Sequence, residues 1–432
     1  MSAELSIERY LFEQAEQDDC CQDWPPPSKD LKLVVVIPAL AESGSIGEVV
    51  ESLPAGSRRK SEVEIIVVVN NSEDAPKEIV ADNITTIEKL AGGTNKGIVL
   101  HVVDRATRGR AYPAAVAGVG AARRTGMDLA LCRLSAVGRS ANGLIACLDA
   151  DSPVAPGYLD YILGHFDEEK PPLAAVCAYR HRLPETDEGS EAIIAYELWL
   201  RYIELGFRLC GSPYAFQSVG SCIVVSGRGY ALADGMPRRK AGEDFYFLQK
   251  IVKVGGGAAV SRIDDAIVLP SARVSDRVPF GTGRAMRRCR GTGPREYLMA
   301  APLEGFSELG RFFAAIGKGF KDPEVLRRSA VPPFESFLQA CGGWRALDKL
   351  RTNNSDPGHF TRAFHVWFDS LRVVRYVNRR RREIGSRWIF SSIKECLERL
   401  GLSGAVSDIE VPADPGAEFG LQTEWLDRLR RV

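Results

Sequence analysis

The sequence lacks the features that would direct it to a membrane, to nucleic acid or to a structural zinc site. Lys and Arg together number 56, as do Asp and Glu, so the net charge is zero and no overall field favours nucleic acid. The ten cysteines include no Cys-x-x-Cys pair, and most lie in apolar runs, as in a reducing compartment. No apolar run is long enough to cross a bilayer, and the acidic start lacks the apolar core of a signal peptide. We therefore expect a soluble, cytoplasmic protein that binds no nucleic acid.

One local cluster of positive charge stands out. Asn378 is followed by four arginines, residues 379–382, within a stretch whose pattern predicts a helix. Such a run is usually a solvated helix face. The alternative is a peripheral contact with a membrane surface.

The length of 432 residues is more than one ordinary hydrophobic core holds, so we expect more than one structural unit. Prolines 25–27 separate a polar N-terminal extension, residues 1–29, from the folded part. Residues 30–300 alternate apolar runs with helical patterns, and the pattern from 301 to 432 is helical. We predict an α/β domain over 30–300 and a helical C-terminal extension over 301–432.

Apolar runs of strand length recur through the first of these regions. Because helices are expected between most of them, the chain should form right-handed βαβ units and a mainly parallel sheet flanked by helices. The predicted strands cover residues 31–37, 62–69, 97–103, 144–148, 173–179, 220–226 and 258–269.

Two carboxylates, Asp149 and Asp151, follow the run at 144–148. Residues i and i+2 of a strand point to the same side, and ligands of open α/β sheets bind at the carboxyl ends of the strands. Two carboxylates on one side repel each other unless a cation lies between them, and Mg²⁺ or Mn²⁺ favours oxygen ligands that it shares with phosphates. The motif therefore predicts a metal-diphosphate site. The alternative is an Asp-Ser-Pro turn that ends a core strand.

Two basic, glycine-containing segments could bind phosphate. Residues 105–113 end in Pro113, which suits the first turn of a helix, so backbone N–H groups and Arg108, Arg110 or Arg123 could meet a diphosphate there. Residues 281–295 are rich in Gly and Arg, and we expect a mobile loop that closes over the diphosphate. The alternatives are glycines that only allow close packing, and a solvated loop.

Glu243 and Asp244 directly precede a predicted helix, residues 245–252. Acidic residues at a helix start can cap the helix and meet its dipole. The functional alternative is a general base at the same edge of the sheet as Asp149 and Asp151.

Taken in order, these motifs resemble the nucleotide-diphospho-sugar glycosyltransferases of family 2 over roughly residues 31–295. The motifs are Val36-Ile37-Pro38-Ala39 with Glu42, Val67 to Asn70-Asn71-Ser72 with Asp74, Gly120-Ala-Ala-Arg123 with Gly126, Leu148-Asp149-Ala150-Asp151, and Gly242-Glu243-Asp244. The resemblance implies the GT-A fold, a Rossmann-like sheet with a nucleotide half and an acceptor half. It also implies an inverting transfer that uses a divalent cation, Mn²⁺ or Mg²⁺.

The resemblance carries roles over by position. Asp244 matches the general base, with Glu243 beside it, and Asp151 matches the metal ligand. The residues that would bind the nucleotide-sugar are Pro38, Ala39, Glu42, Asn70, Arg123, Asp149 and Ala150. The implied partners are a nucleotide-sugar donor and a hydroxyl acceptor, either a small molecule or a glycan.

The sequence also departs from the family pattern. Ala41 stands where the family usually has Asn, and Asn70 stands where it usually has an aspartate that reads the base. The choice between uracil and guanine is therefore open, with a UDP-sugar favoured over a GDP-sugar. The absence of a Gln-x-x-Arg-Trp motif and of membrane spans argues against a processive polysaccharide synthase.

Two other functions stay open as alternatives. A sugar-phosphate nucleotidylyltransferase should carry a Gly/Arg loop directly after the first strand, but residues 39–47 contain no arginine or lysine. A non-catalytic nucleotide-sugar-binding or scaffold protein would explain Ala41 and Asn70 as lost chemistry.

Overall fold

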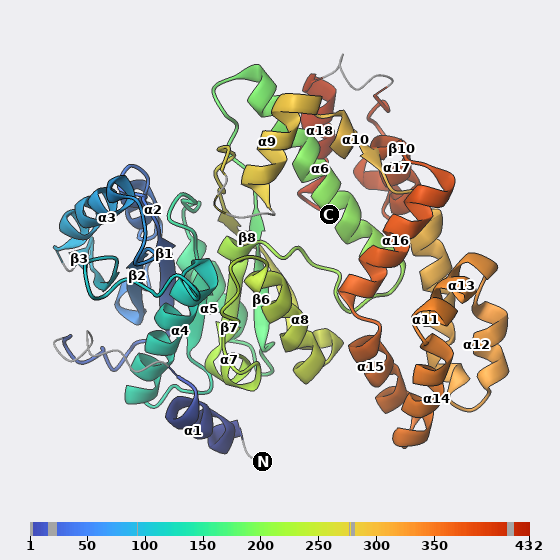
Figure 1. Cartoon of the computed structure of the whole chain (residues 1–432), viewed down its shortest axis with the longest axis horizontal. Helices are drawn as coiled ribbons and strands as arrows, with labels where there is room; N and C mark the ends of the chain where they lie inside the picture. Colours follow the sequence, from blue (N-terminus) through green and yellow to red (C-terminus); the bar gives the residue numbers. More distant parts are fainter. Residues whose placement is uncertain (1–2, 16–23, 93, 276, 278–280, 413–418) are drawn as a thin grey trace. The chain divides into compact units, whose positions relative to one another are not determined.

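Figure 1 shows the computed structural model of the chain, which describes all residues except 1–2, 16–23, 93, 276, 278–280 and 413–418. The chain divides into two compact units. The first spans residues 1–182, 218–272 and 276–281, and the second spans 183–217, 273–275 and 282–432. The domain boundaries expected from the sequence, after residues 29 and 300, stay predictions.

The first unit is built on a sheet whose described strands follow the order β3-β4-β2-β1-β5-β7-β6-β8 (Figure 1). β1 is parallel to β2 and β5, β2 to β4, and β6 to β8, while β7 is antiparallel to both of its neighbours. The strands are β1 (Leu33–Ala39), β2 (Val63–Asn70), β3 (Thr94–Asn95), β4 (Ile98–Arg105), β5 (Leu144–Cys147), β6 (Ala174–Tyr179), β7 (Ile223–Ser226) and β8 (Val260–Val268). The predicted mainly parallel α/β sheet is confirmed.

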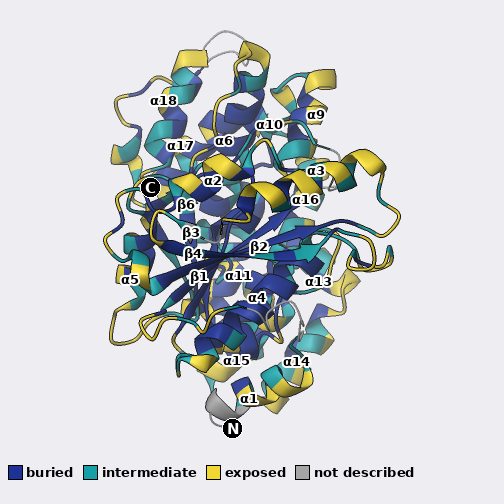
Figure 2. Cartoon of the chain, turned by 90° about the vertical axis from the view of Figure 1, so that its left-hand side faces the viewer, coloured by how far each residue is buried: buried dark blue, intermediate teal, exposed yellow. Residues whose placement is uncertain are grey.

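The middle strands form the core of this unit. Every residue of β1 and β2 is buried, as expected for β-branched strands covered on both faces, and Figure 2 shows these strands in the colour of buried residues. On one face α4 (Val119–Ala136) approaches closely, because a Cβ at Gly126 would collide with Val36 and lie 3.0 Å from a methyl group of Val68. A glycine is therefore needed where α4 crosses the sheet.

The remaining helices of the first unit are α1 (Ala3–Glu13), α2 (Ile46–Ser52), α3 (Lys77–Leu90), α5 (Tyr158–Phe166), α7 (Gly227–Leu232) and α8 (Glu243–Gly255). The expectation that Pro113 begins a helix is wrong. Residues 106–118 form turns and irregular backbone, and α4 begins only at Val119. The bend has a local cause, because the Ala117 N–H bonds the Pro113 carbonyl in a single turn and Gly118 then takes φ +154°.

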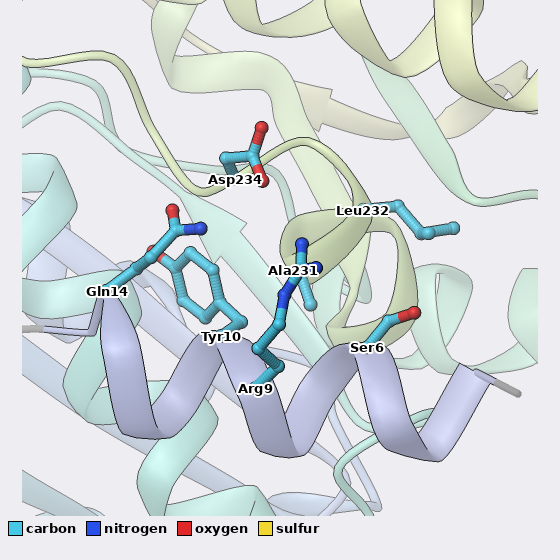
Figure 3. A pocket seen from close by; sticks show the side chains of 7 residues that line it. All are labelled: Ser6, Arg9, Tyr10, Gln14, Ala231, Leu232 and Asp234. Carbon is cyan, nitrogen blue, oxygen red and sulfur yellow. The ribbon is translucent and has the colours of Figure 1, made fainter. Parts of the chain in front are cut away.

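The N-terminal helix α1 packs against α7 through a buried aspartate. The Tyr10 and Tyr230 hydroxyls each donate to Asp128 Oδ1 at 2.7 Å, and Arg124 Nε lies 3.4 Å from Asp128 Oδ2. Asp128 is fully buried, so these groups supply the partners that a buried carboxylate requires. Figure 3 shows the small cavity beside them, where α1 side chains face α7.

The second unit is helical. Its helices are α6 (Asp187–Leu209), α9 (Thr282–Thr292), α10 (Arg295–Leu298), α11 (Glu304–Gly319), α12 (Pro323–Ser329), α13 (Pro332–Ala340), α14 (Gly343–Asn353), α15 (Pro357–Trp367), α16 (Ser370–Ile384), α17 (Ile389–Arg399) and α18 (Phe419–Leu429). A short antiparallel pair joins β9 (Met299–Ala300) to β10 (Arg387–Trp388). The predicted helical C-terminal region is confirmed.

Two sequence expectations for this unit are wrong. The Gly/Arg segment 281–295 is mostly the helix α9, whose buried residues Ala285, Met286 and Cys289 follow a helical spacing, so it is not a loop. The sequence pattern of residues 359–382 also predicts a single helix, whereas the structure has two, α15 and α16. The second begins where the Asp369 side chain accepts the Arg372 N–H at 3.3 Å, a cap that starts a new helix.

Aromatic rings fill the core of the second unit. Phe334 is fully buried, with ring centroids 4.9 Å from Phe312 and 5.0 Å from Tyr376 in edge-to-face contacts. Such pairs stabilise a core beyond the area they bury. In the described part of the chain, no helix is long and apolar enough to cross a membrane.

Candidate functional site

The two aspartates after β5 lie in a tight turn. β5 ends at Cys147, and the Ser152 N–H donates to the Asp149 carbonyl oxygen at 3.1 Å. The strand alternation expected to place Asp149 and Asp151 on one side therefore does not apply, because neither is on the strand. The Ser152 hydroxyl lies 3.4 Å from Asp151 Oδ1. The expected Asp-Ser-Pro turn is present, and it carries both carboxylates beyond the carboxyl end of β5.

Arg123, on the first turns of α4, joins two acidic residues that are far apart in the sequence. Its terminal nitrogens donate to Asp149 Oδ1 and to Glu243 Oε1. The Arg123 and Glu243 side chains are only 4% and 3% exposed, whereas that of Asp149 is 38% exposed. A Cβ at Gly220 would collide with the guanidinium, so the glycine makes room for it.

The charges in this group act on one another. Burial alone would lower the pKa of Arg123, but Asp149 and Glu243 raise it above its ordinary value. Arg123 is therefore always charged and holds both carboxylates in place. Its predicted contact with the nucleotide-sugar stays a prediction, since both terminal nitrogens already donate to carboxylates.

Asp244 begins α8 beside this group. Burial, and next the charge of Glu243, raises the pKa of Asp244 to about 7, although Arg123 and the Phe245 N–H, 2.7 Å from Asp244 Oδ1, lower it. Gly242 is the N-cap of α8, so neither acidic residue is the N-cap, but both lie in the first turn, where their charge meets the helix dipole. A carboxylate that titrates near neutrality is suited to accept a proton from a substrate hydroxyl.

Asparagine side chains tie together the ends of β1 and β2. The Asn70 amide is buried and donates to the Ala39 carbonyl at 3.0 Å. Asn83 of α3 donates to the Asn70 carbonyl at 3.1 Å and to Asn71 Oδ1 at 2.7 Å, and its oxygen accepts the Ala41 N–H at 2.8 Å. An ionised aspartate at position 70 could not donate to a carbonyl, so this network explains an asparagine there.

Glu42 follows this network in the chain. Its side chain accepts a hydrogen bond from the Ser45 hydroxyl at 2.5 Å and one from Arg277, whose other terminal nitrogen donates to the Ala41 carbonyl at 3.2 Å. The residue is only 6% exposed, so an arginine partner is needed. Sequence analysis missed Arg277, which lay in an arginine-rich stretch without a distinguishing pattern, and Asn83, which lies inside an amphipathic helix.

The other predicted residues are close to these groups in the chain. Pro38 and Ala39 are the last two residues of β1, and Ala150 lies in the aspartate turn. All three are buried. The structure thus joins Arg123 to Asp149 and Glu243 by ion pairs, and Asn70 to Ala39 by a hydrogen bond. The binding roles assigned to these residues stay predictions.

A divalent cation would have to share its ligands with a substrate. Among the described residues, no group of three or more His, Cys, Asp or Glu side chains could hold a metal. Mg²⁺ is commonly held by one or two carboxylates together with substrate phosphates and water. The part-exposed Asp151 in its turn fits that kind of ligand, and a site made only of protein side chains does not fit.

The cavity of Figure 3 is a separate feature. It is lined by Ser6, Arg9, Tyr10, Gln14, Ala231, Leu232 and Asp234, none of which belongs to the predicted site.

Comparison with known proteins gives a family for the region that carries this site. Residues 34–223 match the model of Glycosyl transferase family 2. No curated protein matches the chain. Among solved structures, residues 1–349 of S. aureus TarS in complex with UDP-GlcNAc are 14% identical, with a TM-score of 0.37, and the match covers 78% of this chain and 91% of that one.

Two further structures are similar at the same level. The mannosyltransferase PcManGT from Pyrobaculum calidifontis, in complex with GDP-Man and Mn²⁺, is 17% identical with a TM-score of 0.36, over 85% of this chain and 94% of that one. Glucosyl-3-phosphoglycerate synthase from Mycobacterium tuberculosis, with Mn²⁺, UDP and phosphoglyceric acid, is 18% identical with a TM-score of 0.32, over 62% and 76%.

The fold class expected from the sequence is confirmed as a mainly parallel α/β sheet flanked by helices, with a helical C-terminal region. The resemblance expected from the sequence is confirmed for residues 34–223, which match the model of Glycosyl transferase family 2.

Proposed function

We propose that the chain is an inverting glycosyltransferase that moves a hexosyl group from a nucleotide-diphospho-sugar to an acceptor hydroxyl, with Asp244 as the general base. The observation that carries the proposal is the raised pKa of Asp244, about 7, beside the group formed by Arg123, Glu243 and Asp149. A surface aspartate would be a far weaker base at neutral pH.

Asp244 would take the proton of the acceptor hydroxyl as that oxygen attacks the anomeric carbon. The bond from this carbon to the nucleotide diphosphate breaks in the same step, and the diphosphate leaves with the electron pair. One base on the face opposite the leaving group gives a single displacement and therefore inversion. Glycosidases that retain configuration instead use two carboxylates that flank the bond.

Glu243 and Asp149 have a different task in this proposal. Both are held by Arg123, so they cannot swing toward the acceptor, and the negative charge of Glu243 helps to keep Asp244 basic. Asp149 is 38% exposed and can still accept a hydrogen bond from a donor sugar or ribose hydroxyl.

Asp151 is the residue that we propose for a Mn²⁺ or Mg²⁺ ligand. When bound, such an ion would offset the negative charge on the departing nucleotide diphosphate. The remaining ligands would come from the diphosphate and from water. We propose a UDP-sugar rather than a GDP-sugar as the donor, and cytoplasm as the location.

The experiment is an assay of nucleotide release from a panel of UDP- and GDP-sugars with Mn²⁺ and a panel of hydroxyl acceptors, combined with proton NMR of the glycoside product. We expect release from one nucleotide class and a product of inverted anomeric configuration. Asp244→Asn should lower kcat by about 100-fold or more with little change in donor Kd, because it removes the base but not the binding surface.

The matched control is Asp265→Asn, since Asp265 is an exposed aspartate on β8. It should leave kcat unchanged. If wild type releases no nucleotide while it binds the donor tightly, or if Asp244→Asn retains full kcat, the proposed mechanism is wrong. The first result would favour the scaffold alternative.

A further inference from the structure

Exposed cations lie in two segments of the first unit, and one of these segments directly precedes the proposed base in the chain. The first segment is the loop after β4, which carries Arg108 and Arg110. The second lies just before α8 and carries Arg238, Arg239 and Lys240. All five side chains are exposed. We call these side chains the basic rim. The mechanism proposed above gives none of them a role.

Backbone contacts hold the two segments together. Lys240 Nζ donates to the Ala114 carbonyl at 3.1 Å, and a Cβ at Gly118 would lie 3.3 Å from the Lys240 Cα. A Cβ at Gly120 would lie 2.7 Å from the Pro237 carbonyl oxygen. The glycines at 118 and 120 thus let the end of the loop and the start of α4 lie directly against residues 237–240, so the loop that carries Arg108 and Arg110 is anchored to the segment that carries the other three cations.

The basic rim is also fixed with respect to Asp244. The Arg239 guanidinium lies over the Tyr246 ring, 3.8 Å from its centroid, and Tyr246 is in the first turns of α8. Lys240 is four residues before Asp244, so their Cα atoms are at most about 15 Å apart. A small acceptor whose hydroxyl meets Asp244 therefore has the rest of its atoms within reach of the cations at 238–240.

The local charge is strongly positive although the chain as a whole is neutral. Asp104 lies 3.7 Å from Arg110, and Glu73 accepts a hydrogen bond from the Ala114 N–H at 3.2 Å. With the exposed Asp74 beside Glu73, these are three carboxylates against the five cations of the basic rim. Guanidinium and ammonium groups bind phosphate well, and several of them placed around one base would orient a phosphorylated molecule.

We propose that the acceptor carries a phosphate group and that the basic rim binds it, so that the acceptor hydroxyl is directed to Asp244. This inference rests on the proposed function, because it names the acceptor class for that reaction. It adds a specificity determinant that the donor site does not supply.

The test measures phosphate binding directly, because the acceptor is not identified. Glycerol 3-phosphate and glycerol are titrated by calorimetry into protein saturated with UDP and Mn²⁺, or with GDP if UDP does not bind. We expect millimolar binding of glycerol 3-phosphate and none of glycerol. The variant R238Q/R239Q/K240Q should weaken this binding about fivefold or more, since each exposed charge pair contributes modestly. The independent variant R108Q/R110Q should weaken it in the same direction.

The matched control is R284Q/R287Q/R290Q on α9, which removes three exposed positive charges from the second unit. It should leave the Kd within twofold of wild type. Thermal melting confirms that each variant is folded. Equal binding to wild type and R238Q/R239Q/K240Q, or equal binding of glycerol and its phosphate, overturns the proposal.

Two other outcomes separate this inference from the proposed function. If bound nucleotide abolishes glycerol 3-phosphate binding to wild type, the basic rim serves the donor diphosphate, and the acceptor inference is wrong. If no nucleotide binds at all, the proposed function fails. The titration of glycerol 3-phosphate is then repeated without nucleotide. Weaker binding by R238Q/R239Q/K240Q than by wild type would still show an anion site at the basic rim. Equal binding by the two proteins would overturn the inference as well.

Discussion

Replacing Arg123 with methionine should destabilise the protein, and the loss should grow as the pH rises. Methionine has an unbranched side chain, as arginine has, but it lacks the positive charge that faces Glu243 and Asp149. Asp149 is partly exposed and can be hydrated, whereas Glu243 is 3% exposed and would become a buried, unpaired carboxylate. Removing one partner of a buried ion pair typically costs about 3–5 kcal/mol.

Protonation of the buried carboxylate sets an upper limit to this cost. Adding a proton to a glutamate at pH 7 costs about 4 kcal/mol, because its ordinary pKa is about 4.3 and each pH unit is worth about 1.4 kcal/mol. At pH 5 the same step costs about 1 kcal/mol. The folded variant would hold a proton that its unfolded state releases, so its stability falls as the pH rises. We expect a loss of about 4 kcal/mol at pH 7 that shrinks to about 1 kcal/mol at pH 5.

The assay is urea unfolding of wild type, Arg123→Met and the exposed control Arg58→Met at pH 5, 6 and 7. The double variant Arg123→Met/Glu243→Gln should recover at least half of the loss at pH 7, because it removes the unpaired charge. A loss under about 1 kcal/mol at pH 7 with no pH trend would refute the reasoning, since breaking a buried pair costs more. So would a double variant no more stable than Arg123→Met.

Three further predictions follow from other parts of the chain. Asp244→Asn should raise the melting temperature at pH 8 but not at pH 4. The pKa of Asp244 is raised to about 7 in the folded state, so the wild type is destabilised when this carboxylate must be charged in the folded protein at pH 8. Differential scanning calorimetry at both pH values measures the difference. Tyr10→Phe should lower the unfolding free energy by about 1–2 kcal/mol, since it removes a hydrogen bond to the buried Asp128, and Tyr161→Phe, which is 46% exposed, is the control without effect in the same urea titration. Phe334→Ala should cost about 3–5 kcal/mol because it leaves a cavity in the aromatic core of the second unit, and an unchanged urea midpoint would contradict that packing.

The sheet could be predicted because its strands carry a strong local signal. β1 and β2 are β-branched and buried over their whole length, and the pattern of such runs needs no knowledge of distant contacts. The helix α9 was missed because its sequence is dominated by Gly and Arg. Only its three buried positions reveal the helical spacing, and burial is not visible in the sequence.

The candidate site was predicted in its residue types but not in its contacts. Glu243 and Asp149 were both identified, yet the salt bridges to Arg123 join residues 120 and 26 positions apart. Arg277 contacts Glu42 across 235 positions. Such pairs depend on how the sheet folds, so a single sequence carries no signal for them.

The most direct test of the central claim is calorimetric titration of UDP, GDP and their sugar conjugates into wild type and Asp151→Ala, with and without Mn²⁺. Asp265→Ala is the control, since it removes an exposed carboxylate elsewhere on the first unit. We predict that one nucleotide class binds only with Mn²⁺, that Asp151→Ala abolishes this binding, and that Asp265→Ala keeps it. Absence of binding by any nucleotide to wild type, with or without the metal, would contradict the glycosyltransferase account.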